Sequence, residues 1–225
     1  MTSRPDDSPQ APNSTSAGLR VGSADARRQQ VTEALKGIQE FARTMIAGAS
    51  EGGLERLTRA MAKIDRLVDT RMAEVFAMHV QHSGRHIMCK EGCGTCCHQK
   101  VALTKTELIV YAQWLLDNLG EERLAELKQR VFAYMPAWNE NPLVGRMQPS
   151  PMMVNSACIG YPMRPVVCRT HHSFDFDVCL IFRKDPDAKV EVLSQDQAVN
   201  DLAHYVRAGI LAAENPAEPI QPLFW

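Results

Sequence analysis

Hydrophobic residues recur every three or four positions in the first long patterned stretch of the chain. This spacing is typical of one face of an α-helix, and it begins near residue 25. The run AGASEGG at residues 47–53 interrupts it, and a second periodic run with heptad-like spacing extends to about residue 79. The pattern therefore predicts a helical hairpin over residues 26–82.

A second helical region begins with a capping-box signature, in which a Thr side chain and a Glu three residues later close the first helical turn. Here the pair is Thr104 and Glu107, and the predicted helix stops at Gly120. Another helix is predicted over residues 121–134, where Pro136 should end it because proline lacks an amide hydrogen and clashes with the preceding turn.

The remainder of the chain shows less sustained periodicity. Residues 136–157 contain several prolines and are predicted to form a long ordered loop. Residues 190–193 are a candidate for a short strand, and Ser194 with Gln197 is predicted to open a last helix through another capping box.

The two ends of the chain depart from the helical pattern. Residues 1–25 are rich in Ser, Pro, Ala, Asp and Gly, so this segment has too little apolar surface to offset its ordering entropy and is predicted to be a disordered tail. Residues 215–225 form a C-terminal tail that prolines keep from being helical, and its terminal Leu-Phe-Trp is expected to dock on the domain.

Composition and charge exclude several classes of function. The formal charge of −1 gives no overall attraction to nucleic acid, and the basic residues of the second helix are interleaved with acidic ones. No apolar run approaches the roughly 20 residues that a membrane span needs. The first residues lack the apolar core of a secretory signal. We therefore expect a cytoplasmic protein that binds neither nucleic acid nor membrane.

The densest chemistry lies in the run CKEGCGTCCH, which places Cys89, Cys93, Cys96 and Cys97 within nine residues. A CxxC step lets two sulfurs converge on one ion at about 2.3 Å, and the intervening glycines permit the tight turn. Neighbouring side chains diverge, so the adjacent Cys96 and Cys97 favour two metals, a cluster, or one ligand plus one free thiol over a single tetrahedral ion.

A second cysteine group follows about 60 residues later, with Cys158 and Cys168 in CIGYPMRPVVCR and Cys179 beyond. Distant thiols commonly complete a site that a local group begins, because loop-closure entropy rises slowly with loop length. Seven cysteines in a reducing compartment are more typical of metal or redox sites than of disulfides. Arg164 and Arg169 are expected to donate to thiolates or carbonyls, and binding an anionic substrate is the alternative.

Histidines near the cysteine groups are left open as further ligands. Gly84 is expected to end the second helix before the last of three closely spaced histidines. The histidines considered are His79, His82, His86, His98, His171 and His172.

The motifs C-x3-C-x2-C-C, a Leu-Thr-x-x-Glu helix start and C-x5-R-P-x2-C-R together resemble the YkgJ-type cysteine-cluster family, which is described as a candidate zinc- or iron-chelating family. The resemblance covers residues 89–179. It implies that six cysteines bind metal, and that Arg164, Pro165 and Arg169 match the family's RPxxCR segment. The six are Cys89, Cys93, Cys96, Cys97, Cys158 and Cys168.

The chain departs from the family pattern at one place. Many relatives carry another cysteine about eight residues before the position of Cys158, where this chain has the run SPMM. Cys179 is the candidate substitute ligand. The same motif also resembles part of the flagellin lysine methylases, but no glycine-rich nucleotide loop follows a strand here.

These observations predict a metal-binding protein that holds an iron-sulfur cluster, or a zinc or iron ion, on two cysteine groups. Iron-sulfur is favoured because six or seven thiolates that include an adjacent pair suit a cluster, and electron transfer or metal or redox sensing would follow. The alternatives are a structural-zinc interaction module and a thiol oxidoreductase using Cys93 and Cys96. Catalytic residues, protein partners and oligomeric state stay open.

The predicted fold class is mainly α, with irregular cysteine-rich metal-binding loops packed on a helical scaffold and at most a short strand pair. Residues 83–214 would form the cysteine-cluster metal-binding domain, following the helical hairpin.

Overall fold

The computed structural model describes residues 24–99, 101–140, 148–185 and 195–215. In this part of the chain the fold is mainly helical, with one two-stranded antiparallel sheet, and the predicted fold class is confirmed. The predicted N-terminal tail, the candidate strand at residues 190–193 and the C-terminal aromatic residues lie outside the described residues.

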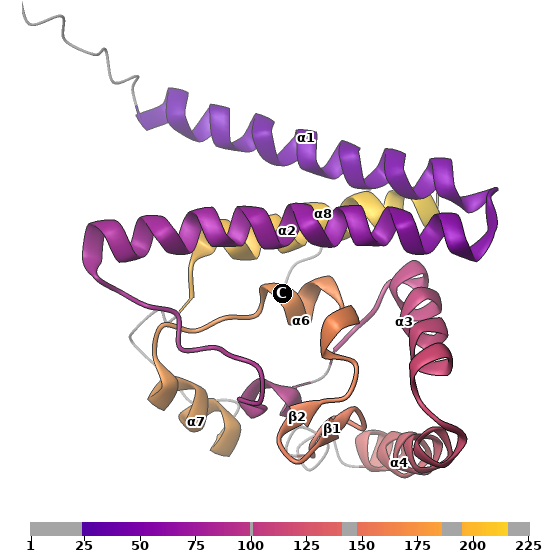
Figure 1. Cartoon of the computed structure of the whole chain (residues 1–225). Coiled ribbons are helices and arrows are strands. Elements are labelled where there is room, and N and C mark those ends of the chain that lie inside the picture. Colours follow the sequence, from indigo (N-terminus) through magenta and orange to yellow (C-terminus); the bar gives the residue numbers. More distant parts are fainter. Residues whose placement is uncertain (1–23, 100, 141–147, 186–194, 216–225) are drawn as a thin grey trace, which may run out of the picture.

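Three long helices form one side of the molecule in Figure 1: α1 (Ala24–Ser50), α2 (Gly53–Ser83) and α8 (Gln197–Glu214). We call them the helical layer. The other elements lie on the other side of α2 in this view (Figure 1). They are η1 (Thr95–His98), α3 (Lys105–Asn118), α4 (Glu121–Glu140), β1 (Met153–Val154), β2 (Ala157–Cys158), η2 (Tyr161–Met163), α6 (Val166–Thr170) and α7 (Phe176–Lys184).

Aliphatic side chains fill the core of the helical layer. The periodic positions of α2 point inward, and Ile64 and Val68 are fully buried in one cluster with Val206 and Ile210 of α8. Gly209 allows α8 to approach α1 closely, because a Cβ atom there would lie only 2.2 Å from the backbone oxygen of Gln39. The predicted hairpin helices thus share their core with the last helix of the chain.

Helix boundaries follow local chemistry. Thr104 caps α3 as predicted: its side chain accepts from the Glu107 amide, and the Glu107 carboxylate accepts from the Thr104 amide. Gly84 ends α2 in the left-handed conformation with φ 64°, so His86 lies outside the helix as expected.

Two predicted helix limits are wrong. Helix α4 continues through Pro136 to Glu140. Pro136 is exposed, so solvent can satisfy the carbonyl that loses its partner, and the helix is not forced to end. The cap of α8 is Asp196, whose side chain accepts from the amides of Ala198 and Val199, and not Ser194. Asp is as good a cap as Ser, so sequence spacing alone selected the wrong residue.

The segment predicted as a long loop contains the strand pair. Met153 pairs with Cys158, and Val154 with Ala157. Asn155 and Ser156 form the connecting turn with φ angles of 51° and 66°, the left-handed values that a two-residue hairpin turn requires. The hairpin places Cys158 at its end.

Among the described residues, no helix is both long enough and apolar enough to cross a membrane.

Candidate metal centre

The first cysteine group lies in an irregular segment that follows α2. Gly92 and Gly94 both adopt left-handed conformations, with φ 81° and 62°, and so permit the tight turns expected around the CxxC step. Gly94 also packs against the β-hairpin, because a Cβ there would lie 2.7 Å from the Ser156 backbone oxygen. A side chain at Gly94 would therefore push the first cysteine group away from the hairpin that carries Cys158.

Backbone hydrogen bonds fix both ends of this group. The amide of Ser150, just before the hairpin, donates to the Cys97 carbonyl at 2.7 Å. At the other end, the Met88 amide donates to the Ser173 carbonyl at 2.9 Å, and the Ser173 amide donates to the Cys89 sulfur at 3.2 Å. An amide aimed at a sulfur stabilises its thiolate form, although burial still raises the pKa of Cys89.

Cys96 and Cys97 are consecutive residues of the 3₁₀ helix η1, and their thiols share a hydrogen bond. The bond raises the pKa of Cys96, and burial adds to the rise. The same bond lowers the pKa of Cys97 to about 7, although burial opposes it. Cys97 is therefore the member of the pair that ionises first, and the two sulfurs do not point to opposite sides as neighbours on a strand would.

The second cysteine group is carried by three elements. Cys158 lies on β2, Cys168 in the middle of α6, and Cys179 on α7. Helix α7 packs against η1 and so brings Cys179 toward the first group. The Tyr111 hydroxyl of α3 contacts the Cys158 sulfur at 3.8 Å.

All seven cysteines lie in the described part of the chain, and all are free thiols. Each is close enough to another to influence its ionisation. Burial raises the pKa of Cys168 to about 12, and the neighbouring Cys97 and Cys158 add to the rise. Cys96 is influenced by Cys168 as well as by Cys89.

Cys89, in turn, is influenced by Cys93 and Cys179. The fold thus gathers all the cysteines predicted as ligands into one neighbourhood. Within it, Cys96 connects a trio of Cys89, Cys93 and Cys179 to a trio of Cys97, Cys158 and Cys168.

The thiols are gathered without converging on one point. In the part of the chain that the structure describes, no three His, Cys, Asp or Glu side chains stand in an arrangement that could hold a metal ion. The donor set still has the chemistry that zinc and iron-sulfur clusters require, since both are bound by thiolates. Binding would need the sulfurs to turn toward one another.

The histidines are less suited to bind metal than the sequence alone allowed. His172 is fully buried and both of its ring nitrogens are used: Nδ1 donates to the Thr170 carbonyl at 2.8 Å, and Nε2 accepts from the Asp196 amide at 2.7 Å. A metal ligand needs a free ring nitrogen, so His172 is structural. Burial lowers the pKa of His171, and the Nδ1 atom of His98 lies 3.3 Å from the Thr95 carbonyl.

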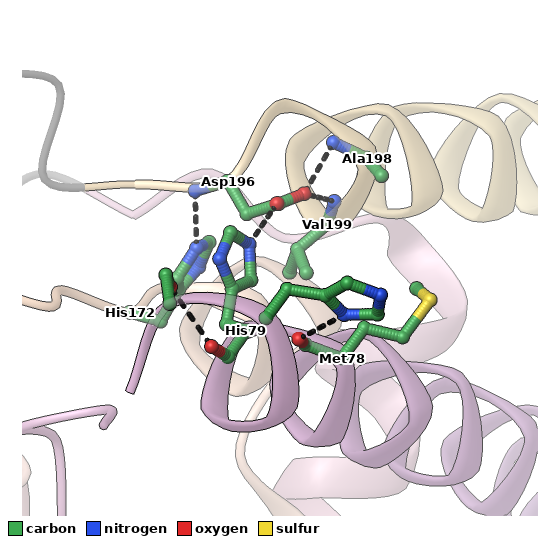
Figure 2. A network of polar contacts seen from close by, with 8 residues as sticks. Met78, His79, His172, Asp196, Ala198 and Val199 are labelled. Atoms are coloured by element: carbon green, nitrogen blue, oxygen red, sulfur yellow. Dashed lines mark hydrogen bonds and ion pairs between the residues drawn. The ribbon is translucent and has the colours of Figure 1, made fainter. Parts of the chain in front are cut away.

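Figure 2 shows His172 in contact with Asp196, the residue before the first residue of α8. Asp196 caps α8 with its side chain, pairs with His79 of α2 and donates its own amide to His172. Because Ser173, which holds Cys89, follows His172 directly, this network fixes the segment next to the first cysteine group.

Arg169 donates to a carbonyl, as one of the two expected alternatives, but its other partners among the described residues are carboxylates and not thiolates. Its guanidinium is buried and donates to Asp69 at 2.8 Å, to Asp65 at 3.1 Å and to the Pro162 carbonyl at 3.1 Å. The buried Asp65 carboxylate attracts it more strongly than a thiol in reach of solvent would. Arg169 thus anchors α6, with Cys168, to α2.

Arg164 partly keeps its expected role. It lies over the Tyr161 ring and donates to the Tyr161 carbonyl at 3.2 Å. Its charge partly offsets the rise in the pKa of Cys168.

Sequence reasoning missed several residues that shape this region, namely Asp65, Asp69, Tyr111, Ser173 and Asp196. Only Asp65 and Asp69 had a usable signal, since two acidic residues four apart on α2 can face one buried arginine.

Comparison with known proteins adds no relative: no protein-family model, no curated protein and no solved structure matches this chain.

Proposed function

We propose that this protein binds metal through its two cysteine groups, holding an iron-sulfur cluster or zinc, in the manner that the resemblance to the YkgJ-type family implies. The observation that supports it most is the gathering of seven thiols from four separate parts of the chain. Burial in an apolar core does not account for this grouping by itself, because every one of these cysteines is partly exposed.

The surroundings of the thiols are consistent with this role. Metal-bound sulfurs are usually held by backbone amides and oriented by neighbouring polar groups. Cys89 has the Ser173 amide, Cys93 has the Thr95 hydroxyl at 3.4 Å, and Cys158 has the Tyr111 hydroxyl. Bound metal would supply positive charge that favours ionisation of Cys89, Cys96 and Cys168, whose pKa values burial raises in the metal-free chain.

The cluster is preferred to a single zinc ion because a tetrahedral zinc site uses only four ligands. Seven thiols in one neighbourhood exceed that number. An iron-sulfur cluster would support electron transfer or the sensing of iron or oxidants, and it fits a reducing, cytoplasmic setting.

Thiol oxidoreductase activity at Cys93 and Cys96 is less well supported. Redox CxxC motifs of the thioredoxin type follow a strand and begin a long helix. Here residues 84–94 are irregular, and Cys96 lies on a helix of only four residues.

The test is purification without oxygen followed by metal analysis. Absorbance near 400 nm with matching iron and sulfide supports a cluster, whereas a colourless protein with bound zinc supports the structural module. A folded protein that takes up neither iron nor zinc, even after reconstitution, would contradict the proposal.

Serine variants identify the ligands. Cys93→Ser and Cys168→Ser, one from each group, should lose most of the metal, because a hydroxyl is a poor ligand for these ions. Met78→Ser is the matched control, since it removes a sulfur from an exposed position on α2. Unchanged metal content in both cysteine variants would show that they are not ligands.

A further inference from the structure

Glu107 is a buried carboxylate that does more than cap its own helix. Its side chain is almost inaccessible to solvent. One carboxylate oxygen accepts from the Thr104 amide at 2.8 Å, which completes the capping box of α3. The other accepts from the Val166 amide, also at 2.8 Å, at the first residue of α6. One side chain therefore joins the beginnings of two helices that are 59 residues apart in the sequence.

The helix that Glu107 holds is the one that carries Cys168. Helix α6 has only five residues, and Cys168 is the third of them. A helix this short has almost no stability of its own, so its position depends on external contacts. At its start the contact is Glu107, and within it Arg169 reaches Asp65 and Asp69 on α2.

Helix α3 makes a further contact with the second cysteine group one turn later. Tyr111 lies four residues after Glu107, on the same face of the helix, and its hydroxyl contacts the Cys158 sulfur. Gly160 leaves room for it, because a Cβ there would lie 2.0 Å from the Tyr111 oxygen. The face of α3 with Glu107 and Tyr111 is thus a template against which Cys168 and Cys158 are placed.

The charge of Glu107 opposes ionisation of the nearby thiol. A buried carboxylate disfavours a second negative charge in its vicinity, and Glu107 contributes to the raised pKa of Cys168, after burial and the neighbouring thiols. If the charge at position 107 were what mattered, a neutral side chain would favour the thiolate form of Cys168 more than a carboxylate does. The carboxylate is therefore explained by its two oxygens, which satisfy two amides at once.

We propose that Glu107 is a positioning residue for the metal site, holding α6 so that Cys168 faces the first cysteine group. This inference rests on the proposed metal-binding function. Glu107 would not touch the metal.

The test compares two kinds of variant. One removes the contact that holds α6, and the other weakens the start of α3 without touching that contact. In Glu107→Ala both amides lose their acceptor, whereas Thr104→Ala and Glu214→Ala weaken the start of α3 but leave the Val166 contact intact. Glu214 is a suitable control because its carboxylate accepts from the Lys105 and Thr106 amides. Glu107→Gln retains one acceptor oxygen and should fall between Glu107→Ala and the wild type.

Metal affinity is measured with zinc and with ferrous iron by competition against a chelator. Loss of a residue that orients ligands typically weakens binding by about 10- to 100-fold, so Glu107→Ala should fall in that range. The two controls should keep the wild-type affinity. Equal losses in Glu107→Ala and Thr104→Ala would overturn the proposal, since Glu107 would then act only as a cap. Tighter binding by Glu107→Gln would also overturn it, because charge would then outweigh position.

A second readout does not depend on metal. In metal-free wild-type protein, the alkylation rate of each thiol by iodoacetamide is followed by mass spectrometry. We expect Glu107→Ala to raise the rate at Cys168 more than Glu107→Gln does, because both remove the charge that opposes ionisation of Cys168 but only Glu107→Ala removes both acceptor oxygens. Cys179 in the same sample should stay unchanged, and Thr104→Ala should change neither thiol. If the wild type binds no metal but Cys168 responds in this way, the metal-binding function fails while the positioning role holds. Equal rates at Cys168 in Glu107→Ala and Glu107→Gln overturn the positioning role, because charge alone then explains the change. If Glu107→Ala proves too unstable to assay, an unchanged rate at Cys168 in Glu107→Gln overturns it.

Discussion

We define the cysteine layer as residues 84–99 and 148–185. The helical layer and the cysteine layer differ in the kind of side chain that they bury. The core of the helical layer consists of buried apolar side chains of α1, α2 and α8, joined by Val110 of α3 and Val166 of α6. In the cysteine layer, only Val166 and Val178 are buried hydrophobic residues among those described. Its buried polar residues are three times as many: Thr95, His98, Arg169, Thr170, His172 and Ser173.

This difference shows which interactions determine the structure of each layer. Apolar burial is non-directional, so the helical layer tolerates many side chains of suitable size. A buried polar group costs free energy unless its partner is in place, so the cysteine layer depends on particular contacts. Some of these contacts also join the layer to the helical layer, as Arg169 does to α2 and His172 does to the start of α8.

The largest effect should come from cutting the link between the layers at Arg169. Arg169→Met leaves Asp65 buried without its cation, and breaking a buried ion pair in this way typically costs about 3–5 kcal/mol. Chemical denaturation measures the loss. The double variant Asp65→Asn with Arg169→Met should recover much of it, because no unpaired buried charge remains. A loss below about 1 kcal/mol in the single variant would mean that α6 is held by its other contacts.

A core deletion in the helical layer should be nearly as costly but should leave the cysteine layer intact. Ile64 is fully buried, and Ile64→Ala is expected to reduce the free energy of unfolding by about 2–5 kcal/mol. Ile181→Ala on α7 is the matched control, since that side chain is 42% exposed and exposed substitutions usually change stability by about 0.5 kcal/mol or less. Metal content per folded chain should stay at the wild-type value in both. Metal loss in Ile64→Ala would show that the two layers are not separable.

The two layers also differ in how far they could be predicted from the sequence. Periodicity located α1 and α2, and the Thr104–Glu107 capping box located α3, because these signals act over a few neighbouring residues. The predictions that failed concern alternatives of similar local energy. Asp196 replaced Ser194 as the cap of α8, and Pro136 was accommodated within α4.

In the cysteine layer the sequence identified the candidate ligands but not what holds them. The structure places Cys158, Cys168 and Cys179 near the first cysteine group, and their role as metal ligands stays a prediction. The partners of Arg169 and His172 lie 100 and 24 residues away, at Asp69 and Asp196. Such pairs leave no local pattern, because they depend on how the helices are arranged.

Protonation of Asp65 offers a way to vary the link between the layers without changing a residue. Burial raises the pKa of Asp65 to about 6, although Arg169 opposes the rise. Between pH 4 and 6 the folded chain therefore retains a proton that the unfolded chain has lost, and stability falls as pH rises, by at most about 1.4 kcal/mol per pH unit.

The Asp65→Asn side chain cannot titrate, so comparing this variant with the wild type isolates the contribution of the Asp65 carboxyl to the pH dependence of stability. The free energy of unfolding of the wild type minus that of Asp65→Asn should decrease as pH rises from 4 to 7, in samples of equal metal content. The measurement is urea denaturation at each pH. A difference that increases with pH would mean that the attraction of Arg169 outweighs burial.

The smallest effect is expected at the other link between the layers, where Asp196 meets His79 and His172. Asp196→Ala removes the cap of α8 and the partner of His79, and loss of a helix cap typically costs about 0.5–2 kcal/mol. Asp196→Asn keeps an acceptor for the helix amides, so it should lose less, and thermal unfolding compares the two. His172 accepts from the backbone amide of Asp196, and no side-chain substitution at position 196 other than proline removes that donor. The segment that carries Ser173 should therefore stay in place, and metal content should be unchanged in both variants. If Asp196→Ala releases metal, the side-chain pair with His79, and not the backbone contact, is what fixes the cysteine layer at this end.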